Sequence, residues 1–311
     1  MKNHNNALEM NHENNLFKKN QSNLKSRHLT QKAFYTILWI GGIITILILL
    51  AVVGYVVGQG IKVIDWQFLS TPPKGGLSGE GGISTTIVTT FYLVFLTILI
   101  AAPLGVGAAI YLVEYAGDTS ISSKFLQRLI QFAHFGVETL AGIPSIIFGL
   151  FGYALFVSAM HFGFSLLSAS LAGACLVLPT IIRTTEEALL TVPSSYREGS
   201  LALGATKWQT VYKVVLPAAL PGVITGIILS VGRIVSETAV FYVTLGGSYR
   251  MPTSIMSSGR TMALHLYYLA MDTNAFDKAM GTGAILIISI ILINLLINFL
   301  SRKLTAGVRE I

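Results

Sequence analysis

The feature of the sequence that most constrains the fold is the presence of long runs without a single charged residue. Ala33–Ile61 and Gly81–Val113 are two such runs, and Thr139–Ile182 is a third. A transmembrane helix needs about 20 largely apolar residues to cross roughly 30 Å of hydrocarbon. Because each run is at least that long, the chain is predicted to fold within a lipid bilayer.

The overall composition also favours a membrane protein over a soluble one. Apolar residues make up 53% of the chain, whereas Asp, Glu, Lys and Arg together make up 11%, against about 25% in an ordinary soluble domain. So few charges would leave most of a soluble surface uncovered. The single cysteine, Cys175, excludes an internal disulfide and a metal cluster held by cysteines. The histidines lack the spacing of metal ligands, so no metal site is predicted.

The charge-free runs predict an all-α integral membrane protein with six transmembrane helices. Thr139–Ile182 is long enough for two spans joined by a turn at His161–Ser165, and the next span carries Arg233 and Glu237 within it. The predicted spans lie in Ala33–Ile61, Gly81–Val113, the two halves of Thr139–Ile182, Lys213–Arg250 and Ala279–Ser301.

The basic residues between the spans predict how the chain is oriented. With the N-terminus inside, Lys and Arg are concentrated in the segments that face the cytoplasm, as the positive-inside rule requires. Both termini are therefore predicted to be cytoplasmic. This asymmetry and the attraction of basic residues to anionic headgroups account for the net charge of +7. No nucleic-acid partner is therefore predicted.

The same pattern divides the chain into segments of different character. The first apolar run follows a long polar tail and is too long for the core of a signal peptide, so we expect it to remain as an anchor. The predicted segments are a disordered cytoplasmic N-terminal tail (1–32), the first transmembrane helix (33–61), an external Gly-rich connector (62–84), a core membrane domain (85–301) with a cytoplasmic loop at 193–217, and a cytoplasmic C-terminal tail (302–311).

The most informative stretch is the predicted cytoplasmic loop Glu198–Pro217. Its apolar residues recur every three or four positions, which predicts one face of a helix. Gly204 permits a sharp bend that would present a short helix away from the membrane. A loop of this kind is either an interfacial helix lying on lipid or a docking element for a soluble partner. The periodicity does not distinguish these two interpretations.

The spacing within this loop resembles the coupling loop of ABC-importer permeases. In that family the loop carries Glu-Ala-Ala, three residues, Gly, nine residues, Ile, one residue and then Leu-Pro. This chain departs from the pattern by small residues in place of the alanines and by a valine in place of the isoleucine. The residues at the matching positions are Glu198, Gly199, Ser200, Gly204, Val214, Leu216 and Pro217.

Three further stretches are similar to the phosphate branch of that family, and more to its PstA type than to its PstC type. They are Leu140–Gly152, Leu216–Ala239 and Met262–Tyr268. The resemblance implies a type I ABC-importer permease fold in the bacterial inner membrane. It also implies a second permease of the PstC type, a homodimeric ATPase of the PstB type and an external phosphate-binding protein of the PstS type. ATP and Mg would be used by the ATPase, and this chain would bind no cofactor.

Two groups of charged residues within the predicted spans are candidates for the substrate pathway. An ionisable residue inside a membrane costs about 2.5–3.5 kcal/mol on insertion scales, so each needs an explanation. Arg233 is expected deep in its span, with Glu237 one helical turn further on the same face. This pair either binds an anion weakly enough to release it or only holds helices together. The resemblance to phosphate permeases adds Arg183 and Glu186 to the pathway, although Arg183 can also snorkel to the headgroups.

Other classes of protein explain the sequence less well. The chain has no Gly-x4-Gly-Lys-Ser/Thr loop, so it is not expected to hydrolyse ATP or to be an enzyme by itself. An ion-coupled secondary carrier would favour broken helices and paired repeats, and the sequence indicates neither. A passive anion pore would use Arg233 as a selectivity ring. Among importers, the alternative is a permease for another oxyanion, sulfate or molybdate.

Overall fold

The computed structural model describes residues 2–74, 79–116, 124–273 and 275–309. In these ranges the regular structure is helical, apart from two isolated bridges at Pro73–Gly81 and Gly246–Gly259. The backbone contacts divide the chain into two units, 1–55 and 56–311. Five helices in the described ranges are long and apolar enough to cross a membrane, or six if one bent pair is counted as a single span. The all-α prediction with six candidate spans is confirmed.

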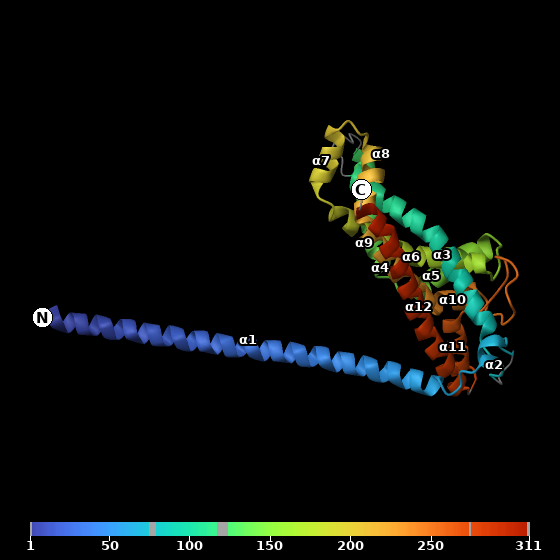
Figure 1. The fold of residues 1–311 in the computed structure, drawn as a ribbon, viewed down its shortest axis with the longest axis horizontal. Helices are drawn as coiled ribbons and strands as arrows, with labels where there is room; N and C mark the ends of the chain where they lie inside the picture. Colours follow the sequence, from blue (N-terminus) through green and yellow to red (C-terminus); the bar gives the residue numbers. More distant parts are fainter. Residues whose placement is uncertain (1, 75–78, 117–123, 274, 310–311) are drawn as a thin grey trace. The chain divides into compact units, whose positions relative to one another are not determined.

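The helices are shown in chain order in Figure 1. Three of the segments, labelled η, are short π-helical turns that continue a neighbouring α-helix. The elements are α1 (Lys2–Gly60), α2 (Trp66–Ser70), α3 (Ser84–Ile110), η1 (Tyr111–Tyr115), α4 (Lys124–Ala141), α5 (Ser145–Gly152), η2 (Tyr153–Ala159), α6 (Leu166–Leu190), α7 (Ser194–Ala202), α8 (Lys207–Thr210), η3 (Val211–Val215), α9 (Leu216–Ser236), α10 (Ala239–Thr244), α11 (Met262–Met271) and α12 (Phe276–Arg309).

The first helix, α1, is longer than the sequence predicts. Its apolar part, Gln31–Gly60, is a candidate membrane span, as expected for 33–61. The polar segment before it, expected to be disordered, continues the same helix back to Lys2. Extending an existing helix adds one backbone hydrogen bond per residue without a new nucleation cost. Of the connector expected at 62–84, the short helix α2 is described, whereas residues 75–78 lie outside the described residues.

The centre of the second unit is α6, which packs against both α3 and α9. Small residues allow these helices to approach closely, as is typical of membrane helix interfaces. A side chain at Gly105 of α3 would meet Ile181 of α6, and one at Gly226 of α9 would meet Thr184 of α6. The three helices therefore form a compact bundle whose inner faces have no room for larger residues.

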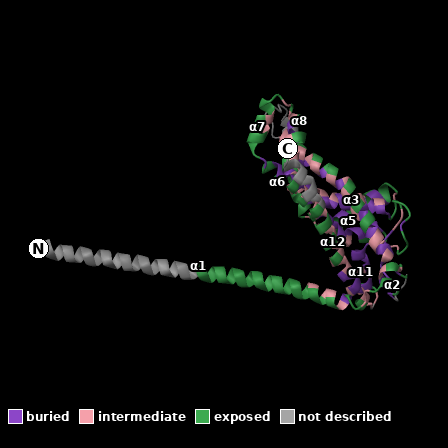
Figure 2. Ribbon diagram, viewed as in Figure 1, coloured by how far each residue is buried: buried purple, intermediate pink, exposed green. Residues whose placement is uncertain are grey.

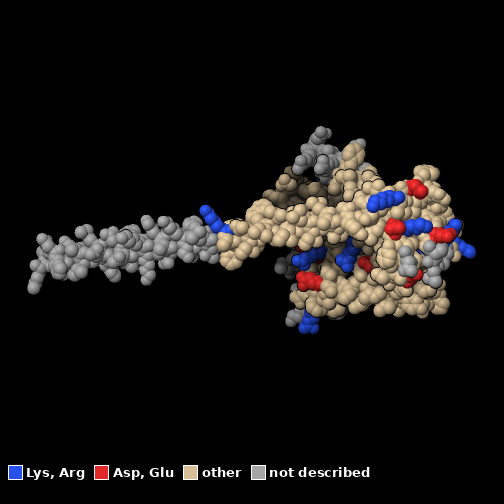
Figure 3. Space-filling view, turned by 90° about the horizontal axis from the view of Figure 1, so that it is seen from below, with Lys and Arg blue, Asp and Glu red and all other residues tan. Residues whose placement is uncertain are grey.

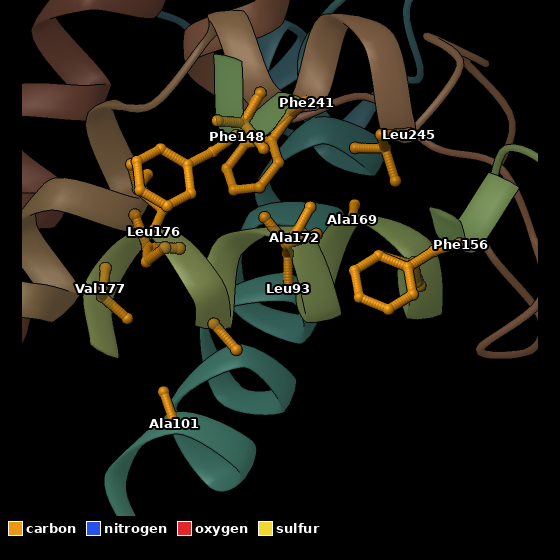
Figure 4. Packing of buried hydrophobic residues seen from close by; sticks show 14 of the residues in the cluster. Leu93, Ala101, Phe148, Phe156, Ala169, Ala172, Leu176, Val177, Phe241 and Leu245 are labelled. Atoms are coloured by element: carbon orange, nitrogen blue, oxygen red, sulfur yellow. The ribbon is translucent and has the colours of Figure 1, made fainter. Parts of the chain in front are cut away.

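The main hydrophobic core lies where α3, α5, α6 and α10 meet. Figure 4 shows the rings of Phe148 from α5 and Phe241 from α10 next to each other over α6. Ala169 and Ala172 of α6 are fully buried beneath them, and Leu93 of α3 closes the cluster from the other side. Figure 2 shows that buried residues gather in this region. Small alanines on α6 thus make room for aromatic rings from the two short helices.

The third predicted span is sharply bent instead of straight. The helical segments Ile130–Ala141 and Ser145–Ala159 meet at 111°. The break falls at Gly142, Ile143 and Pro144. Proline has no N–H to donate to the preceding turn and disfavours the helical conformation in the residue before it. The turn expected at His161–Ser165 is present between η2 and α6, where His161 has a φ of 59°.

The fifth predicted span, Lys213–Arg250, is also interrupted. The helix runs as a candidate span over Lys207–Ser236, and Glu237 then adopts an extended backbone with φ −73° and ψ 129°. The short helix α10 follows. Broken helices are not evident in the sequence, but the second unit contains breaks at two places. The short helices after the two breaks, α5 and α10, pack against each other.

Different elements of the second unit lie at the two ends of α3 (Figure 1). Near its start, Thr85 Oγ1 donates a hydrogen bond to the Tyr249 carbonyl at 3.0 Å, and α2 and α11 lie at this end (Figure 1). Near its other end are α7 and α8, and α12 runs from the first end toward the second. Figure 3 shows one face, on which Lys, Arg, Asp and Glu form a few groups on an otherwise uncharged surface. We call the end with α7 and α8 the hairpin end and the other the α11 end.

The close packing of α6 and α9 predicts a strong difference between two glycines of α9. Replacing Gly226 by Ala should lower the melting temperature of the purified protein, because the new methyl group would lie 2.9 Å from Thr184 Cβ. Overpacking of this kind costs about 1–3 kcal/mol. The control is Gly232→Ala on the same helix, where nothing lies within 4 Å, and which should leave the melting temperature unchanged or raise it. Equal melting temperatures for the two variants would contradict this account of the helix contact.

Candidate functional site

The predicted coupling loop folds as a helical hairpin. Its first arm is α7, and its second arm is α8 followed by η3, which continues into α9. Between the arms, Gly204 has a φ of +84°, a conformation that residues with a side chain rarely adopt. Thr206 and Gln209 then form a capping box that starts α8. The bend expected at Gly204 is therefore present, and the glycine is there because the backbone requires it.

Side-chain contacts hold the two arms of the hairpin together. The Ser200 hydroxyl of α7 lies 2.9 Å from the Thr210 hydroxyl of α8. Val211 and Val215 are buried, whereas Glu198 and Gly199 face the open side, with nothing within 4 Å of a side chain placed at Gly199. Of the predicted coupling residues, Ser200 and Gly204 therefore shape the hairpin, and Glu198 and Gly199 lie on its accessible surface.

The tip of the hairpin exposes large apolar side chains. Leu203 is 91% exposed, and Trp208 and Tyr212 are 64% and 61% exposed. The two aromatic rings stack with their centroids 6.1 Å apart. The single apolar stripe predicted from the sequence is thus divided between a buried face and an exposed face. A rigid apolar tip of this kind is typical of a surface that another protein or a membrane covers.

A buried ion pair attaches the hairpin to the helix bundle. Arg197 of α7 donates from Nη2 to Glu114 Oε1 at 2.6 Å and from Nε to the same carboxylate at 3.0 Å. The same guanidinium donates to the carbonyls of Val192 and Leu189 at the end of α6, at 2.8 and 2.9 Å. The Glu114 side chain, in η1, is only 7% exposed. One arginine therefore joins α7, α6 and the end of α3.

The sequence analysis did not select this ion pair. Arg197 precedes the resembling motif by one residue, and Glu114 follows the charge-free run Gly81–Val113 by one residue. A carboxylate directly after a span is weak evidence of a functional ion pair, because charged residues commonly mark the end of a span where it reaches water. The partner across 83 positions of sequence is visible only in the fold. A cavity of about 640 Å³ beside this pair is lined by residues of η1, α6, α7 and α8.

Arg183 is part of an ionic cluster between α4 and α6. It donates from Nε to Glu187 Oε1 at 3.1 Å and from Nη1 to Glu138 Oε1 at 3.3 Å. Glu186, expected beside Arg183 in the pathway, is instead buried, with its carboxylate 3.6 Å from His134 Nδ1. The ion pairs of Arg183 among the described residues are with Glu187 of its own helix and Glu138 of α4, and not with Glu186. Glu138 and His134 also belong to this cluster, and no local sequence pattern distinguishes them.

Arg233 lies on the face of α9 that does not pack within the subunit. Its side chain is exposed, and it shares this face with Thr225, Leu229 and Ser236. The next residue, Ile234, is buried, and it lies against Gly173 of α6. Gly173 is about 10 Å along α6 from its first residue, Leu166, at 1.5 Å per residue. Among the described residues, no carboxylate lies within ion-pair distance of the Arg233 guanidinium.

The predicted pairing of Arg233 with Glu237 is wrong in this structure. The pairing assumed an uninterrupted helix, but α9 ends at Ser236. Instead, Glu237 Oε1 accepts a hydrogen bond of 3.3 Å from the backbone N–H of Val240 in α10. Glu237 therefore stabilises the break after α9, and the positive charge of Arg233 has no counter-charge within ion-pair distance among the residues that the structure describes.

The chemistry that this arrangement allows is the binding of an anion. A free guanidinium offers planar paired donors that suit an oxyanion. Within the described residues, no group of three His, Cys, Asp or Glu side chains is placed to hold a metal ion. The candidate site thus has two parts: an exposed cation at the break after α9, and an apolar hairpin at the other end of the same continuous helical segment.

Comparison with known proteins places the chain among membrane components of import systems. The family described as "Binding-protein-dependent transport system inner membrane component" matches residues 120–310. The probable ABC transporter permease protein YqgI of Bacillus subtilis is 32% identical over 302 residues, covering 91% of this chain and 100% of that protein. The phosphate transport system permease protein PstA 1 of Mycobacterium tuberculosis is 34% identical over 219 residues, covering 69% of each chain.

A solved structure supports the same fold. A bacterial ABC transporter involved in the import of the acidic polysaccharide alginate matches with a TM-score of 0.54 at 17% identity, covering 70% of this chain and 78% of that chain. At this identity the likeness concerns the arrangement of the helices alone. The type I ABC-importer permease fold expected from the sequence is thereby confirmed.

The ion pair between Arg197 and Glu114 predicts how firmly α7 is held. Glu114→Gln should increase hydrogen exchange over Ser194–Ala202, because it leaves a largely buried guanidinium without its counter-charge, at a cost of about 3 kcal/mol. Exchange measured by mass spectrometry would detect this locally. Lys213→Gln is the control, because it removes one exposed charge from η3 and should leave exchange in α7 unchanged. Equal exchange in both variants would show that the pair does not hold α7.

Proposed function

The chain belongs to the family of binding-protein-dependent transport system inner membrane components, and from this premise we propose that it is the permease subunit of an ATP-driven importer for inorganic phosphate. An ABC-importer permease is a transport subunit, and its ATPase is a separate chain. Phosphate is favoured by the likeness to the PstA 1 protein and by the uncompensated cation at Arg233. Sulfate or molybdate is the alternative cargo, because the same guanidinium suits other tetrahedral oxyanions.

The observation that carries this proposal is the exposure of Arg233 on α9. An arginine facing lipid costs several kcal/mol. The neighbour of Arg233, Ile234, lies against Gly173 of α6, so Arg233 lies at a depth well inside the span of α6. This face of α9 is therefore expected to face water or a second permease instead of acyl chains. Two such faces, one from each permease, would enclose a pathway in which Arg233 attracts the anion.

The binding of the anion must also be reversible, because a transport site has to release its cargo. The expected helical pairing would have let Glu237 compete with the anion for Arg233. In this fold, Glu237 instead accepts a hydrogen bond from α10. Release of the anion would therefore depend on movement at the break between α9 and α10. When α9 and α10 move relative to each other, the donors around the anion separate and its affinity falls. Arg183 is already neutralised by Glu187 and Glu138, and Glu186 is buried. Neither would bind the anion directly; both would affect the pathway by fixing the position of α6 against α4.

The hairpin is the proposed site for the ATPase. Glu198, Gly199 and the apolar tip around Leu203 would insert into a groove on one copy of a homodimeric ATPase, which uses ATP and Mg. Closure of that dimer would move α7, and Arg197 would pass the movement to α6 and to the end of α3. Because η3 continues into α9, the same movement reaches the helix that carries Arg233. The remaining partners would be a second permease and an external phosphate-binding protein.

Two other classes of transporter fit less well. A secondary carrier would use broken helices, which this fold contains, but it would have no use for the exposed hairpin tip. A passive pore would not need the hairpin either. In both classes transport would continue without ATP, so uptake by vesicles containing the assembled complex separates them from an importer. ATP-independent uptake would contradict the proposal.

Replacement of Arg233 tests the proposed pathway. Arg233→Gln should reduce uptake of radiolabelled phosphate by about tenfold or more, since a charge-assisted hydrogen bond is worth roughly 1.5–3 kcal/mol. Arg233→Lys should retain part of the uptake, because it keeps the charge but loses the paired donors. Arg128→Gln, which removes an exposed charge from α4, is the control. Unchanged uptake by a correctly assembled Arg233→Gln complex would remove Arg233 from the pathway.

Replacement of Leu203 tests the docking of the hairpin. Leu203→Asp should prevent co-purification with the ATPase subunit, because a carboxylate would have to be buried at the centre of an apolar contact. The isolated subunit should keep its melting temperature, since Leu203 is 91% exposed. Leu203→Met keeps the apolar side chain and should retain the ATPase. Normal recovery of the ATPase with the Asp variant would instead favour a hairpin lying on lipid.

A further inference from the structure

We propose that Arg260 and the tyrosines around it form a second binding site for a phosphate-type oxyanion, at the α11 end of the subunit. The site is separate from Arg233, and it rests on the proposed function for its role in transport. There it would receive the anion before the anion reaches the break between α9 and α10.

The loop after α10 is shaped by two glycines in left-handed conformations. Gly246 and Gly247 have φ values of +89° and +73°, which residues with a side chain rarely adopt. This turn aims the Gly247 carbonyl at Arg260, whose Nε donates a hydrogen bond to it at 2.8 Å. Ser258 fixes the other side of the loop by donating to the Leu245 carbonyl at 2.7 Å. The guanidinium is therefore held in one orientation.

Two further contacts hold the guanidinium in place, one with an aromatic ring and one with an imidazole. Its central carbon lies 4.2 Å from the centre of the Tyr268 ring, as in a cation–π contact. One terminal nitrogen, Nη1, lies 3.4 Å from His265 Nδ1. Arginine has five N–H donors, and these contacts use two of its three nitrogens. The Nη2 donors have no hydrogen-bond partner among the described residues, so they are available to an anion.

Arg260 forms no ion pair with the described residues of the subunit. No carboxylate of the described residues lies within ion-pair distance of it, and Asp272, whose field reaches it, is an exposed residue beyond that distance. Burial, with the charges of Arg260 and Lys278, lowers the pKa of His265 to about 3. The imidazole is therefore neutral near pH 7 and does not repel a cation or supply a counter-charge. A partly buried, unpaired guanidinium is a strong attractor for an anion.

Tyr268, whose ring contacts this cation, belongs to a cluster of three tyrosines with further donors. Tyr242 of α10 lies 6.0 Å from both Tyr267 and Tyr268 of α11, measured between ring centres, and the last two are 6.2 Å apart. None of the three hydroxyl groups has a hydrogen-bond partner among the described residues. A phenolic hydroxyl can donate to an oxyanion, so the cluster combines one fixed positive charge with uncommitted donors.

The position of the cluster suits the path of an imported anion. It lies at the α11 end, opposite the hairpin, since the backbone N–H of Met262 donates to Thr90 Oγ1 near the start of α3 at 2.9 Å. Tyr242 belongs to α10, which begins directly after the break at Glu237. An anion held by Arg260 would thus sit at one end of the short helix whose other end adjoins Arg233. The same chemistry would also bind the phosphate group of an anionic lipid.

Binding of inorganic phosphate to the assembled complex tests the proposal. The complex would carry Arg233→Gln, so that the proposed transport site does not contribute, and would be placed in phosphatidylcholine nanodiscs. Adding Arg260→Gln should weaken the remaining saturable binding of radiolabelled phosphate by about tenfold or more, as expected for a lost charge-assisted hydrogen bond. Arg250→Gln is the matched control, because it removes an exposed charge from the same loop, and it should change binding by less than about twofold.

The other outcomes are equally definite. If Arg260→Gln fails to assemble, Arg260→Lys keeps the charge without the paired donors and should still weaken binding by about threefold or more. If phosphatidylglycerol displaces phosphate from the complex, and this lipid co-purifies unless Arg260 is replaced, the site stands with a headgroup as its occupant. No saturable binding, or binding that is insensitive to Arg260, would overturn the inference. Uptake by the Arg233→Gln complex alone tests the proposed function, so the two ideas can fail separately.

Discussion

The low polarity of the bilayer is the constraint on which the rest of this structure depends. A charge in hydrocarbon must be paired, exposed to water or covered by protein, and the ionisable residues of the second unit follow this rule in different ways. Glu114 is buried with Arg197, Arg183 is neutralised by two glutamates, and Arg233 has no carboxylate within ion-pair distance in the described part of the chain. A charge without such a partner, as at Arg233, indicates where an anion or another subunit belongs.

A single continuous helical segment connects the coupling hairpin with the break that carries Arg233. The hairpin continues from α8 through η3 into α9 without a loop, so a displacement of its tip acts directly on the helix that carries Arg233. Arg197 adds a second connection, to α6 and to the end of α3. The glycine contacts between α6 and α9 keep these helices close, which favours their movement as a body. The breaks before α5 and after α9 are then the places where the bundle can change shape.

The parts of the site that could be predicted are those encoded in local sequence. The charge-free runs gave the spans, and the spacing around Glu198 gave the hairpin and its bend at Gly204. The pairing of Arg233 with Glu237 was wrong because it assumed helical periodicity through Ser236, and periodicity does not show where a helix stops. Arg183 was expected beside Glu186, but it contacts Glu187 and Glu138, because the choice depends on how α4 lies against α6.

The sequence by itself determined the solvent, the number of candidate spans, the family and the position of the coupling hairpin. These follow from hydrophobicity and from spacing within short stretches, both of which are local properties of the chain. Only the tertiary structure decided which charges are paired, because Glu114 and Arg197 lie 83 positions apart. It also decided that Arg260 is held by Gly247 and Tyr268 without a carboxylate. Such contacts depend on the packing of distant helices, and in a bilayer that packing determines which charges are neutralised and which stay free to bind.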